Sequence, residues 1–508
     1  MTITGSTTEP NKDPFSSDKR LDPDALGAEP DAGADGTAEA AVVSEDGDPV
    51  PDEAADEAAV EQEEAEAPQP EGPEFGSPEW QRYWRIALDQ AIVRINEMLA
   101  HQLAEIMAHR RFRQLESLWI GANQVVDVTM GRADVEVELL CISKEDLMED
   151  FDEYPDPSDS GLFYHLYKTE YDQAGGKPFT AILTHYEFSH KAFDLRLMKM
   201  LSMVAASCHC PTIGNAGATL FGLRNIRNLE EIKDFELHFG SQEYVKWQSL
   251  RENEDSRYLG MALPRMLIQK KRRRLPPLYC RHYALRDSMK TWIPASYGFG
   301  MILIRSFIRH GWCIYIRGPR TGGLIGEIVP SEIGGKGMPI REIPLEVSLS
   351  DHNEHEISNQ GFIPFVYYKD WERICLFSAP SLQRPDRRDG GQATFDRIAA
   401  SMAYLFLVCR LAHFTKVIQR ENIGTTKEAP ELEKEINRWL KGLITKMPNP
   451  EVELRSLYPL RDGLVKVSED PSNPGFYRAK LVVQPHLQLE GVNAELTLIS
   501  KMPREKEQ

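Results

Sequence analysis

The sequence lacks the features that mark several large classes of protein. Its seven cysteines are scattered, odd in number and without a C-x-x-C pair, which favours a reducing compartment over a disulfide framework. The first ten residues, MTITGSTTEP, have no charged segment and no apolar core, so they do not resemble a signal peptide. The most apolar window, Met402–Val408, falls far short of the about 20 residues that span a membrane. These absences predict a cytoplasmic protein with no membrane insertion.

Charge of one sign is concentrated at one end of the chain. Residues 1–74 hold 22 Asp and Glu but 3 Lys and Arg, a net of −19 that equals the formal charge of all 508 residues, and 56 of each sign remain in residues 75–508. With Phe15 as its only aromatic residue, this segment cannot bury enough apolar surface to offset the entropy of ordering it. We therefore predict a disordered acidic tail over residues 1–74, with no strand in it.

The neutral body argues against nucleic-acid binding, which needs a basic face to release counterions. The one basic run, Lys270–Arg274, is expected to be an exposed loop, with phosphate binding or nuclear import as the alternatives.

Beyond the tail, the periodicity of apolar residues predicts a mixed α/β fold. Ser77 and Pro78 suit the start of a long packing helix. One apolar stripe of that helix, spaced by threes and fours, comprises Leu88, Ile92, Ile95, Leu99, Leu103 and Ile106. Alternation over Val135–Cys141 predicts a strand with one wet face.

The second half of the chain predicts further buried elements. A buried helix and then an interior strand through Trp312, Ile314 and Ile316 are expected from the apolar run between Trp292 and Ile316. Two more helices are expected, over about 395–421 and over 431–446, and the chain ends in strands.

Patterns that suggest chemistry are few. Cys208, His209 and Cys210 stand too close together to complete a tetrahedral zinc site alone. The segment Arg317–Gly323, RGPRTGG, lacks the G-K-[S/T] ending of a phosphate-binding loop. The most enzyme-like cluster comprises Glu346, Asp351, Glu354, His355 and Glu356. We predict no catalytic site, metal or cofactor; an enzyme would require a pocket that holds Glu346, Asp351 and His355 together.

Seven long strings, spread from Phe112 to Pro503, carry a resemblance to a known family. They are Phe112–Ala122 (FRQLESLWIGA), Gly175–His190 (GGKPFTAILTHYEFSH), Trp247–Arg265 (WQSLRENEDSRYLGMALPR), Gly311–Pro330 (GWCIYIRGPRTGGLIGEIVP), Gly361–Asp370 (GFIPFVYYKD), Arg410–Gly424 (RLAHFTKVIQRENIG) and Asn473–Pro503 (NPGFYRAKLVVQPHLQLEGVNAELTLISKMP). In this order they resemble the large subunit of the type VI secretion contractile sheath.

The resemblance implies an α/β (α+β mixed) fold with a contractile tail-sheath-like core of two stacked domains and terminal arms. The expected domains are the disordered acidic tail (1–74), an N-terminal packing helix region (75–130), the sheath core domain (131–380) and a C-terminal inner sheath domain with a terminal strand arm (381–508). The implied function is structural: the subunit pairs with a small sheath subunit and assembles around an inner tube to drive its ejection. Implied partners are neighbouring sheath protomers, the inner tube protein, the baseplate and an AAA+ disassembly ATPase that acts through the small subunit.

Three sets of residues are expected at subunit contacts. An ion-pair lattice between subunits would use Arg251, Glu252, Glu254, Asp255 and Arg257, with a solvated helix face as the alternative. A C-terminal strand arm that joins a neighbour's sheet would use Asn493, Ala494, Glu495, Leu496, Thr497, Leu498 and Ile499. A tube-facing helix would present Glu431, Glu433, Lys434, Glu435, Arg438 and Lys441.

Four segments depart from the family pattern. Trp119–Ala122 reads WIGA where the family tends to read W-R-G-L, and Val483–Gly491 replaces the usual R-P-H-F. Asp351–Ile357, DHNEHEI, replaces a charged subunit contact of the type D-R-R-E-x-E-L, and Ile268–Lys290 aligns poorly. These departures fit a divergent second copy of the large subunit. The alternative function is a non-sheath cytosolic scaffold or binding protein that forms a closed oligomer.

Overall fold

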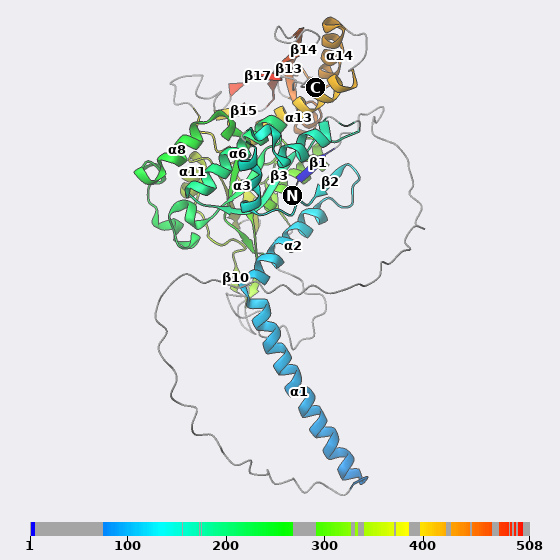
Figure 1. Ribbon diagram of the computed structural model, residues 1–508, viewed down its shortest axis with the longest axis vertical. Helices are drawn as coiled ribbons and strands as arrows, with labels where there is room; N and C mark the ends of the chain where they lie inside the picture. Colours follow the sequence, from blue (N-terminus) through cyan, green and yellow to red (C-terminus); the bar gives the residue numbers. More distant parts are fainter. Residues whose placement is uncertain are drawn as a thin grey trace, which may run out of the picture. The chain divides into compact units, whose positions relative to one another are not determined.

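A computed structural model describes most of the chain beyond its acidic segment (Figure 1). The described residues are 2–5, 75–154, 156–171, 173, 175–267, 291–326, 331–333, 340–369, 372–385, 397–422, 428–447, 450–469, 477–486, 488–489, 492–493 and 496–500. The predicted tail from residue 6 to 74, the basic run Lys270–Arg274 and the arm residues Ala494 and Glu495 lie outside them. The chain divides into two compact units, Asp13–His101 and Met1–Lys12 with Gln102–Gln508.

The described part of the first unit is the beginning of helix α1 (Pro78–Ala108), and residues 102–108 of that helix belong to the second unit. The predicted cap is confirmed, because Ser77 Oγ accepts a hydrogen bond from Trp80 N at 3.0 Å. Five of the six stripe residues are 46–61% exposed within this chain, namely Leu88, Ile92, Ile95, Leu99 and Ile106, so packing of this stripe stays a prediction.

The second unit is built on an eight-stranded sheet of order β2-β1-β3-β4-β5-β11-β12-β8. Its strands are β1 (Thr2–Gly5), β2 (Val135–Glu138), β3 (Ala181–Phe188), β4 (Thr212–Ala216), β5 (Leu259–Leu263), β8 (Leu324–Ile325), β11 (Phe362–Tyr368) and β12 (Arg373–Leu376). The four central strands β3, β4, β5 and β11 are parallel, and the strands on either side pair antiparallel. Parallel strands that are buried on both faces have nearly continuous apolar sequences. This accounts for the sequences LGMAL in β5 and FIPFV in β11.

Strand β1 corrects the prediction that the first 74 residues hold no strand. Thr2–Gly5 pairs antiparallel with β2 over four residues and with β3 over two. The short uncharged start of the chain thus belongs to the main sheet, although the acidic stretch begins a few residues later.

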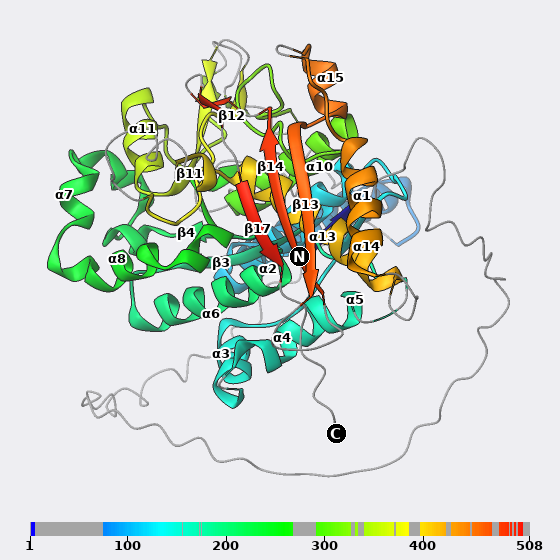
Figure 2. The same cartoon turned by 90° about the horizontal axis from the view of Figure 1, so that it is seen from above.

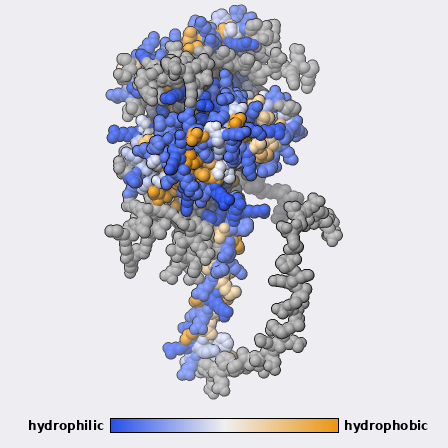
Figure 3. Space-filling view, turned by 90° about the vertical axis from the view of Figure 1, so that its left-hand side faces the viewer, coloured by the Kyte–Doolittle hydropathy of each residue, from blue (hydrophilic) through white to orange (hydrophobic). Residues whose placement is uncertain are grey.

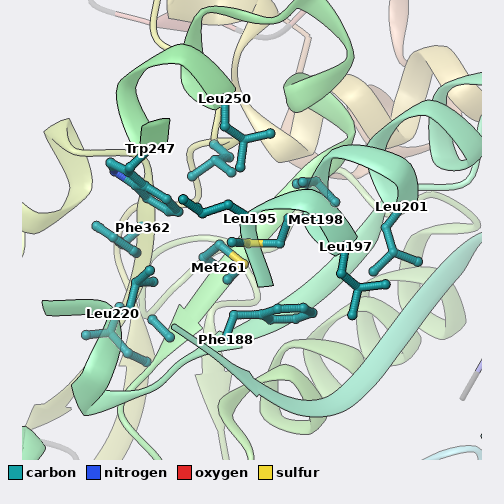
Figure 4. Close-up of a cluster of buried hydrophobic side chains, with 14 of the residues drawn as sticks. Phe188, Leu195, Leu197, Met198, Leu201, Leu220, Trp247, Leu250, Met261 and Phe362 are labelled. Carbon is teal, nitrogen blue, oxygen red and sulfur yellow. The ribbon is translucent and has the colours of Figure 1, made fainter. Parts of the chain in front are cut away.

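Successive residues of the central strands point to two separate cores. On one face Leu259, Met261 and Phe362 pack with helices α3 (Lys144–Glu153), α6 (Ala192–Cys208) and α8 (Val245–Glu252). Figure 4 shows this core, with Phe188, Met261 and Phe362 among side chains of α6 and α8. On the other face Ala262 and Ile363 pack with α2 (Arg110–Val128), α10 (Ala295–His310) and α13 (Met402–Glu421).

Local polar contacts fix where these helices begin. Helix α3 starts with a capping box in which Ser143 and Asp146 bond reciprocally. Helix α6 has no capping side chain at Lys191, but Asp194 in its first turn accepts hydrogen bonds from Ser189 N at 2.7 Å and Lys144 Nζ at 2.8 Å. A carboxylate at this end also offsets the positive end of the helix dipole.

A third core joins α13 to a small C-terminal sheet. The strands β13 (Leu460–Glu469), β14 (Tyr477–Pro485) and β17 (Leu496–Ser500) form an antiparallel ladder, with α14 (Ala429–Lys441) against β13. Figure 2 shows these strands side by side, with α14 next to β13. The predicted helix 395–421 therefore begins at Met402, and the predicted helix 431–446 ends at Lys441.

The predicted strand through Trp312, Ile314 and Ile316 is wrong, because this segment is buried but irregular. The segment follows the predicted buried helix, which is observed as α10. Its side chains are shared between the core that contains α10 and the core of the C-terminal sheet, and it joins no sheet.

The remaining elements are short. They are α4 (Gly161–Phe163), α5 (Thr169–Tyr171), α7 (Phe235–Phe239), α11 (Asp351–Asn359), α15 (Val452–Leu457), β6 (Met266–Leu267), β7 (Trp292–Ile293), β9 (Ser331–Ile333), β10 (Ile340–Glu342), β15 (Gln488–Leu489), β16 (Val492–Asn493), a π-helical turn at Tyr164–Lys168 and 3₁₀ turns at Pro157–Asp159, Ala218–Phe221, Ile226–Glu231, Gln242–Tyr244 and Glu254–Tyr258. In the part of the chain that is described, no helix combines the length and hydropathy needed to cross a bilayer.

Candidate assembly surfaces

Arg251, near the end of α8, is a buried clamp within the chain. Its exposed fraction is 2%. The guanidinium donates to Leu382 O at 3.2 Å, Gln360 Oε1 at 3.0 Å and Asn359 O at 3.3 Å. The side chain thereby ties α8 to the end of α11 and to the segment after β12, and a contact of Arg251 with another subunit stays a prediction.

The other four charges of that predicted lattice lie at the surface or partly buried. Glu252 and Glu254 are exposed, and Arg257 Nε donates to Glu254 O at 3.1 Å. Partial burial raises the pKa of Asp255, while the charge of Arg257 acts to lower it. A subunit contact through these four residues stays a prediction.

Arg265 forms an ion-pair cluster that the sequence did not reveal. Its Nε and Nη2 bond to Oε2 and Oε1 of Glu346 at 2.8 and 2.6 Å, and its Nη1 lies 3.1 Å from Glu187 Oε1. The cluster joins the end of β3 to residues just after β5 and before α11. Because its partners lie far apart in the sequence, no local spacing could have indicated it.

The rest of the enzyme-like cluster is spread over α11. Burial raises the pKa of Glu354, whereas Asp351 and His355 are exposed. Glu356 Oε1 lies 3.1 Å from His352 Nε2, an ordinary pair one helical turn apart. No hydrogen bond or ion pair between described residues joins Glu346 to Asp351 or His355.

Cys208, His209 and Cys210 end helix α6 inside the protein. His209 takes a left-handed conformation (φ 52°) at the helix C-cap, and its Nδ1 lies 2.8 Å from Ala206 O. Burial raises the pKa of Cys208 to about 12, which keeps the thiol protonated and a poor ligand. Over the described residues, His, Cys, Asp and Glu side chains nowhere gather in threes as a metal ion needs.

A cavity of about 290 Å³ beside β2 is lined by the charged residues Glu136, Glu138, Glu170 and Lys177. Lys177 pairs with Glu136, and its backbone N–H donates to Glu170 Oε2 at 2.6 Å. Three of the four charged residues that line the cavity, Glu136, Glu170 and Lys177, thus bond to one another.

Helix α14 buries one face and exposes charge on the other. Leu432, Ile436 and Leu440 are buried in the third core. Glu433 Oε2 accepts a hydrogen bond from Val467 N at 2.9 Å, so this carboxylate is used within the chain. The surface-exposed charges of the predicted tube-facing helix are Glu431, Lys434, Arg438 and Lys441, with Glu435 partly buried.

The predicted C-terminal strand arm pairs within its own chain. Leu496–Ile499 belong to β17, which pairs with β14 in a register that sets Leu498 opposite Leu481, and Asn493 belongs to β16. Because β17 is the last strand in its sheet order, its outer edge is where a further strand could add. Addition to a neighbouring chain stays a prediction.

About half of the exposed large apolar residues among those described lie on α1 and α2. Apolar side chains are visible among polar ones along α1 (Figure 3). On α2, Phe112, Leu115, Trp119 and Val126 recur at spacings of three, four and seven and are all exposed. The opposite side of α2 packs closely, since a Cβ on Gly121 would lie 2.3 Å from the ring of Tyr297. Stripes of this kind are typical of helices that bind another helix.

Comparison with known proteins identifies the family. Residues 89–383 match the model "EvpB/VC_A0108, tail sheath N-terminal domain", and residues 392–502 match "EvpB/VC_A0108, tail sheath gpW/gp25-like domain". The type VI secretion system sheath protein TssC1 of Pseudomonas aeruginosa PAO1 is 33% identical over 442 residues, which cover 83% of this chain and 87% of that protein.

Two solved structures are similar at a level that carries no argument by itself. One is the baseplate of the anti-feeding prophage, with a TM-score of 0.34, 10% identity and coverage of 69% of this chain and 75% of that chain. The other is a sheath tail protein of Listeria innocua, with a TM-score of 0.36, 6% identity and coverage of 72% and 63%.

The matched ranges cover every strand of the main sheet except β1, and they also cover the C-terminal sheet. The chain therefore belongs to the EvpB family of contractile tail sheath proteins and is a sheath subunit of the type VI secretion kind.

Proposed function

We propose that this sheath subunit is the large half of a two-chain protomer, and that α1 binds a helix of the small sheath subunit. The observation that supports the pairing is the apolar stripe of α1, which this chain leaves exposed. Leu88, Ile92, Ile95, Leu99 and Ile106 repeat at spacings of four, three, four and seven, which is the seam of a helix that packs against another helix.

The size of the stripe argues for an obligate partner. Burying one Leu or Ile side chain contributes roughly 1.5–3 kcal/mol, so five half-exposed residues offer several kcal/mol to a matching helix. An apolar surface of this extent on an unpaired chain is an aggregation liability. The isolated chain is accordingly expected to be poorly soluble.

The further partners follow from membership of the family and are part of the proposal. Protomers assemble around the inner tube in the cytoplasm, on a baseplate, and an AAA+ ATPase takes the contracted sheath apart through the small subunit. The charged face of α14 would meet the tube, and the outer edge of β17 would receive a strand from a neighbour.

The pairing is tested by co-expressing the chain with the small sheath subunit encoded beside it. Ile95→Asp with Leu99→Asp places two carboxylates in the stripe and should weaken co-purification by at least about 100-fold, the loss of roughly 3 kcal/mol. The matched control, Gln90→Asp with His101→Asp, adds two carboxylates on the opposite face of the same helix and should bind normally.

Equal binding by both variants would remove α1 from the interface. A wild-type chain that forms a closed oligomer of defined size and ignores the small subunit would favour the scaffold alternative instead.

A further inference from the structure

Several arginines gather where the end of α10 meets the strands β8 and β12. Arg305 Nη1 donates a hydrogen bond to Leu324 O in β8 at 2.8 Å, and β8 pairs with β12. Arg309 follows one helical turn later and is exposed, as is Arg373 at the start of β12. Burial, and then the charges of Arg373 and Arg309, lower the pKa of Arg305 to about 10. The three guanidinium groups therefore repel one another.

Positive charge continues from α10 to α15 and to the start of β13. Helix α15 packs against α10. The ring centres of His310 and Tyr315 are 4.6 Å apart, and burial raises the pKa of Tyr315 while the charge of Arg455 on α15 acts to lower it. Burial also lowers the pKa of His486, and the charges of Arg455 and Arg461 act in the same direction. One basic surface thus extends over three elements.

This basic surface has few counter-charges. We call it the arginine face, and it comprises Arg305, Arg309, Arg373, Arg455 and Arg461. Four of its members form no ion pair with any residue that the structure describes, namely Arg309, Arg373, Arg455 and Arg461. Guanidinium groups held close together repel one another unless carboxylates or other anions join them. The arginine face therefore suits an anionic partner from outside the chain.

Helix α3 carries the opposite charge on its surface. Glu145, Glu149 and Glu153 are exposed and follow one another at spacings of four, so they lie along one side of the helix. Like charges at this spacing destabilise a helix, and no cation among the described residues pairs with these three. By contrast, Asp150 in the same helix accepts a hydrogen bond from Gly161 N at 2.8 Å. We call the three glutamates the glutamate ridge.

The arginine face and the glutamate ridge lie far apart on the second unit. Figure 2 shows α3 at one end of this unit and α10, α15 and β12 at the other. The two surfaces therefore cannot meet within one chain, but they can meet between two copies. A heterologous contact joins two different surfaces of the same molecule and repeats without closing, as a row of identical subunits requires.

We propose that the arginine face of one copy of this chain binds the glutamate ridge of the next copy, so that copies line up head to tail in the sheath. The contact adds a partner surface to the proposed function and uses none of the α1 residues proposed to bind the small subunit. Arginine forks can bond carboxylates with two parallel hydrogen bonds, which gives the contact a defined geometry. Opposite charges also bring the two copies together in the correct orientation.

Charge reversal on each surface tests the contact in the full chain, co-expressed with the small sheath subunit. Arg309→Glu with Arg373→Glu should reduce the sedimentable assemblies at least tenfold, and Glu145→Arg with Glu149→Arg should do the same. A mixture of the two variants should recover most of the assembly, because each reversed surface then meets an opposite charge on the other variant. Recovery in the mixture would also show that both variants are folded.

A second pair of glutamates supplies the matched control. Glu230 and Glu231 are exposed in the 3₁₀ turn Ile226–Glu231, outside both charged surfaces. Glu230→Arg with Glu231→Arg makes the same change in net charge as the reversal on α3 and should assemble as the wild type does. Equal loss of assembly in this control would show a general effect of net charge and overturn the proposal.

Three other results would overturn the proposal. They are normal assembly by either reversed variant, no recovery in the mixture, and a wild-type chain that stays as single copies at low salt. Loss of assembly that is confined to the arginine variant would assign the arginine face to a different anionic partner. Co-purification of the small subunit, measured on the same samples, tests the proposed function separately, because it depends on α1 and not on either charged surface.

Discussion

Replacing one buried arginine should stabilise this protein. Arg410, in α13, is 5% exposed, and its Nε and Nη2 have no hydrogen-bond partner among the described residues. Its guanidinium carbon lies 4.9 Å from the ring centre of Phe307 and 5.3 Å from that of Phe414. A buried charge with two unsatisfied N–H groups loses hydration that contact with two aromatic faces only partly replaces. We predict that Arg410→Met raises the free energy of unfolding.

The magnitude follows from the balance of two terms. Burial lowers the pKa of Arg410 from 12.5 to about 10, against a smaller opposing effect of Cys313. At about 1.4 kcal/mol per pKa unit, holding this charge in the folded chain costs roughly 3 kcal/mol. In a desolvated site two cation–π contacts return up to about 2 kcal/mol each, which offsets most of that cost. Replacement of a buried ionic group by an apolar side chain of similar volume is nonetheless often neutral or stabilising, and methionine keeps apolar contact with the rings, so we expect a gain of at most about 1 kcal/mol.

The sign of the pH dependence follows from the same pKa. The folded-state pKa lies below the unfolded one, so the unfolded chain binds the extra proton between pH 10 and 12.5 and stability rises with pH there. At pH 7 both states are protonated and the full cost is present. The gain from Arg410→Met should therefore be constant between pH 6 and 8.

Arg420, ten residues later on the same helix, supplies the matched control. Its Nη1 donates to the backbone oxygens of Glu170, Tyr171 and Gln173, each at 3.1 Å. Arg420→Met leaves these carbonyls without that donor and should destabilise by about 1.5–3 kcal/mol.

Urea unfolding of the chain in complex with the proposed small subunit, followed by tryptophan fluorescence, measures both changes. Trp312 and Trp439 lie in or against the third core, next to α13, and report on this region. The midpoints should move in opposite directions. A midpoint for Arg410→Met below that of the wild type would refute the argument that desolvation outweighs the aromatic contacts.

Three other outcomes are expected. Burial lowers the pKa of His413 to about 3. Between pH 6.5 and 3 the unfolded chain therefore binds a proton at this residue that the folded chain does not bind. The free energy of unfolding should fall by about 1.4 kcal/mol for each pH unit of acidification in that range. His413→Gln should flatten that slope in unfolding curves recorded from pH 7 to 5; an unchanged slope would contradict the assignment. Gly121→Ala should cost about 1–3 kcal/mol because its Cβ would lie 2.3 Å from Tyr297 Cδ2, whereas Asn123→Ala on the exposed side of α2 should lower the melting temperature little. Gly322→Ala should destabilise as well, since φ is +104° and the Cβ would meet Tyr315 O at 2.2 Å; a melting temperature equal to wild type would show that the loop can rearrange.

Features that depend on neighbouring residues were predictable from the sequence. The cap at Ser77, the alternation that begins at Val135 and the end of a helix at Glu421 follow from side chains within one or two turns. The family was predictable for a different reason, because long strings in a fixed order leave few alternatives.

Features that depend on distant partners were not predictable. The charges of Arg251 and Glu346 indicated a lattice and an acidic cluster, but their hydrogen-bond partners lie 81 to 131 positions away and decide what each does. The chain segment Thr2–Gly5 is too short to indicate a strand by its own pattern, and it becomes one because β2 and β3 leave a place for it. The burial of the α1 stripe was not predictable for the same reason. Its apolar pattern is the same whether the helix packs against this chain or against another.

Helix α13 contributes to two cores at once. Met402, Leu405 and Phe406 belong to the core under the main sheet, whereas Leu407 and Leu411 belong to the core under the C-terminal sheet. Unfolding of either sheet would expose one apolar face of α13, and the remaining sheet could not cover that face. The two sheets should therefore unfold as one cooperative block, and a pull on the C-terminal sheet should be transmitted along the helix to the main sheet instead of being absorbed at a hinge.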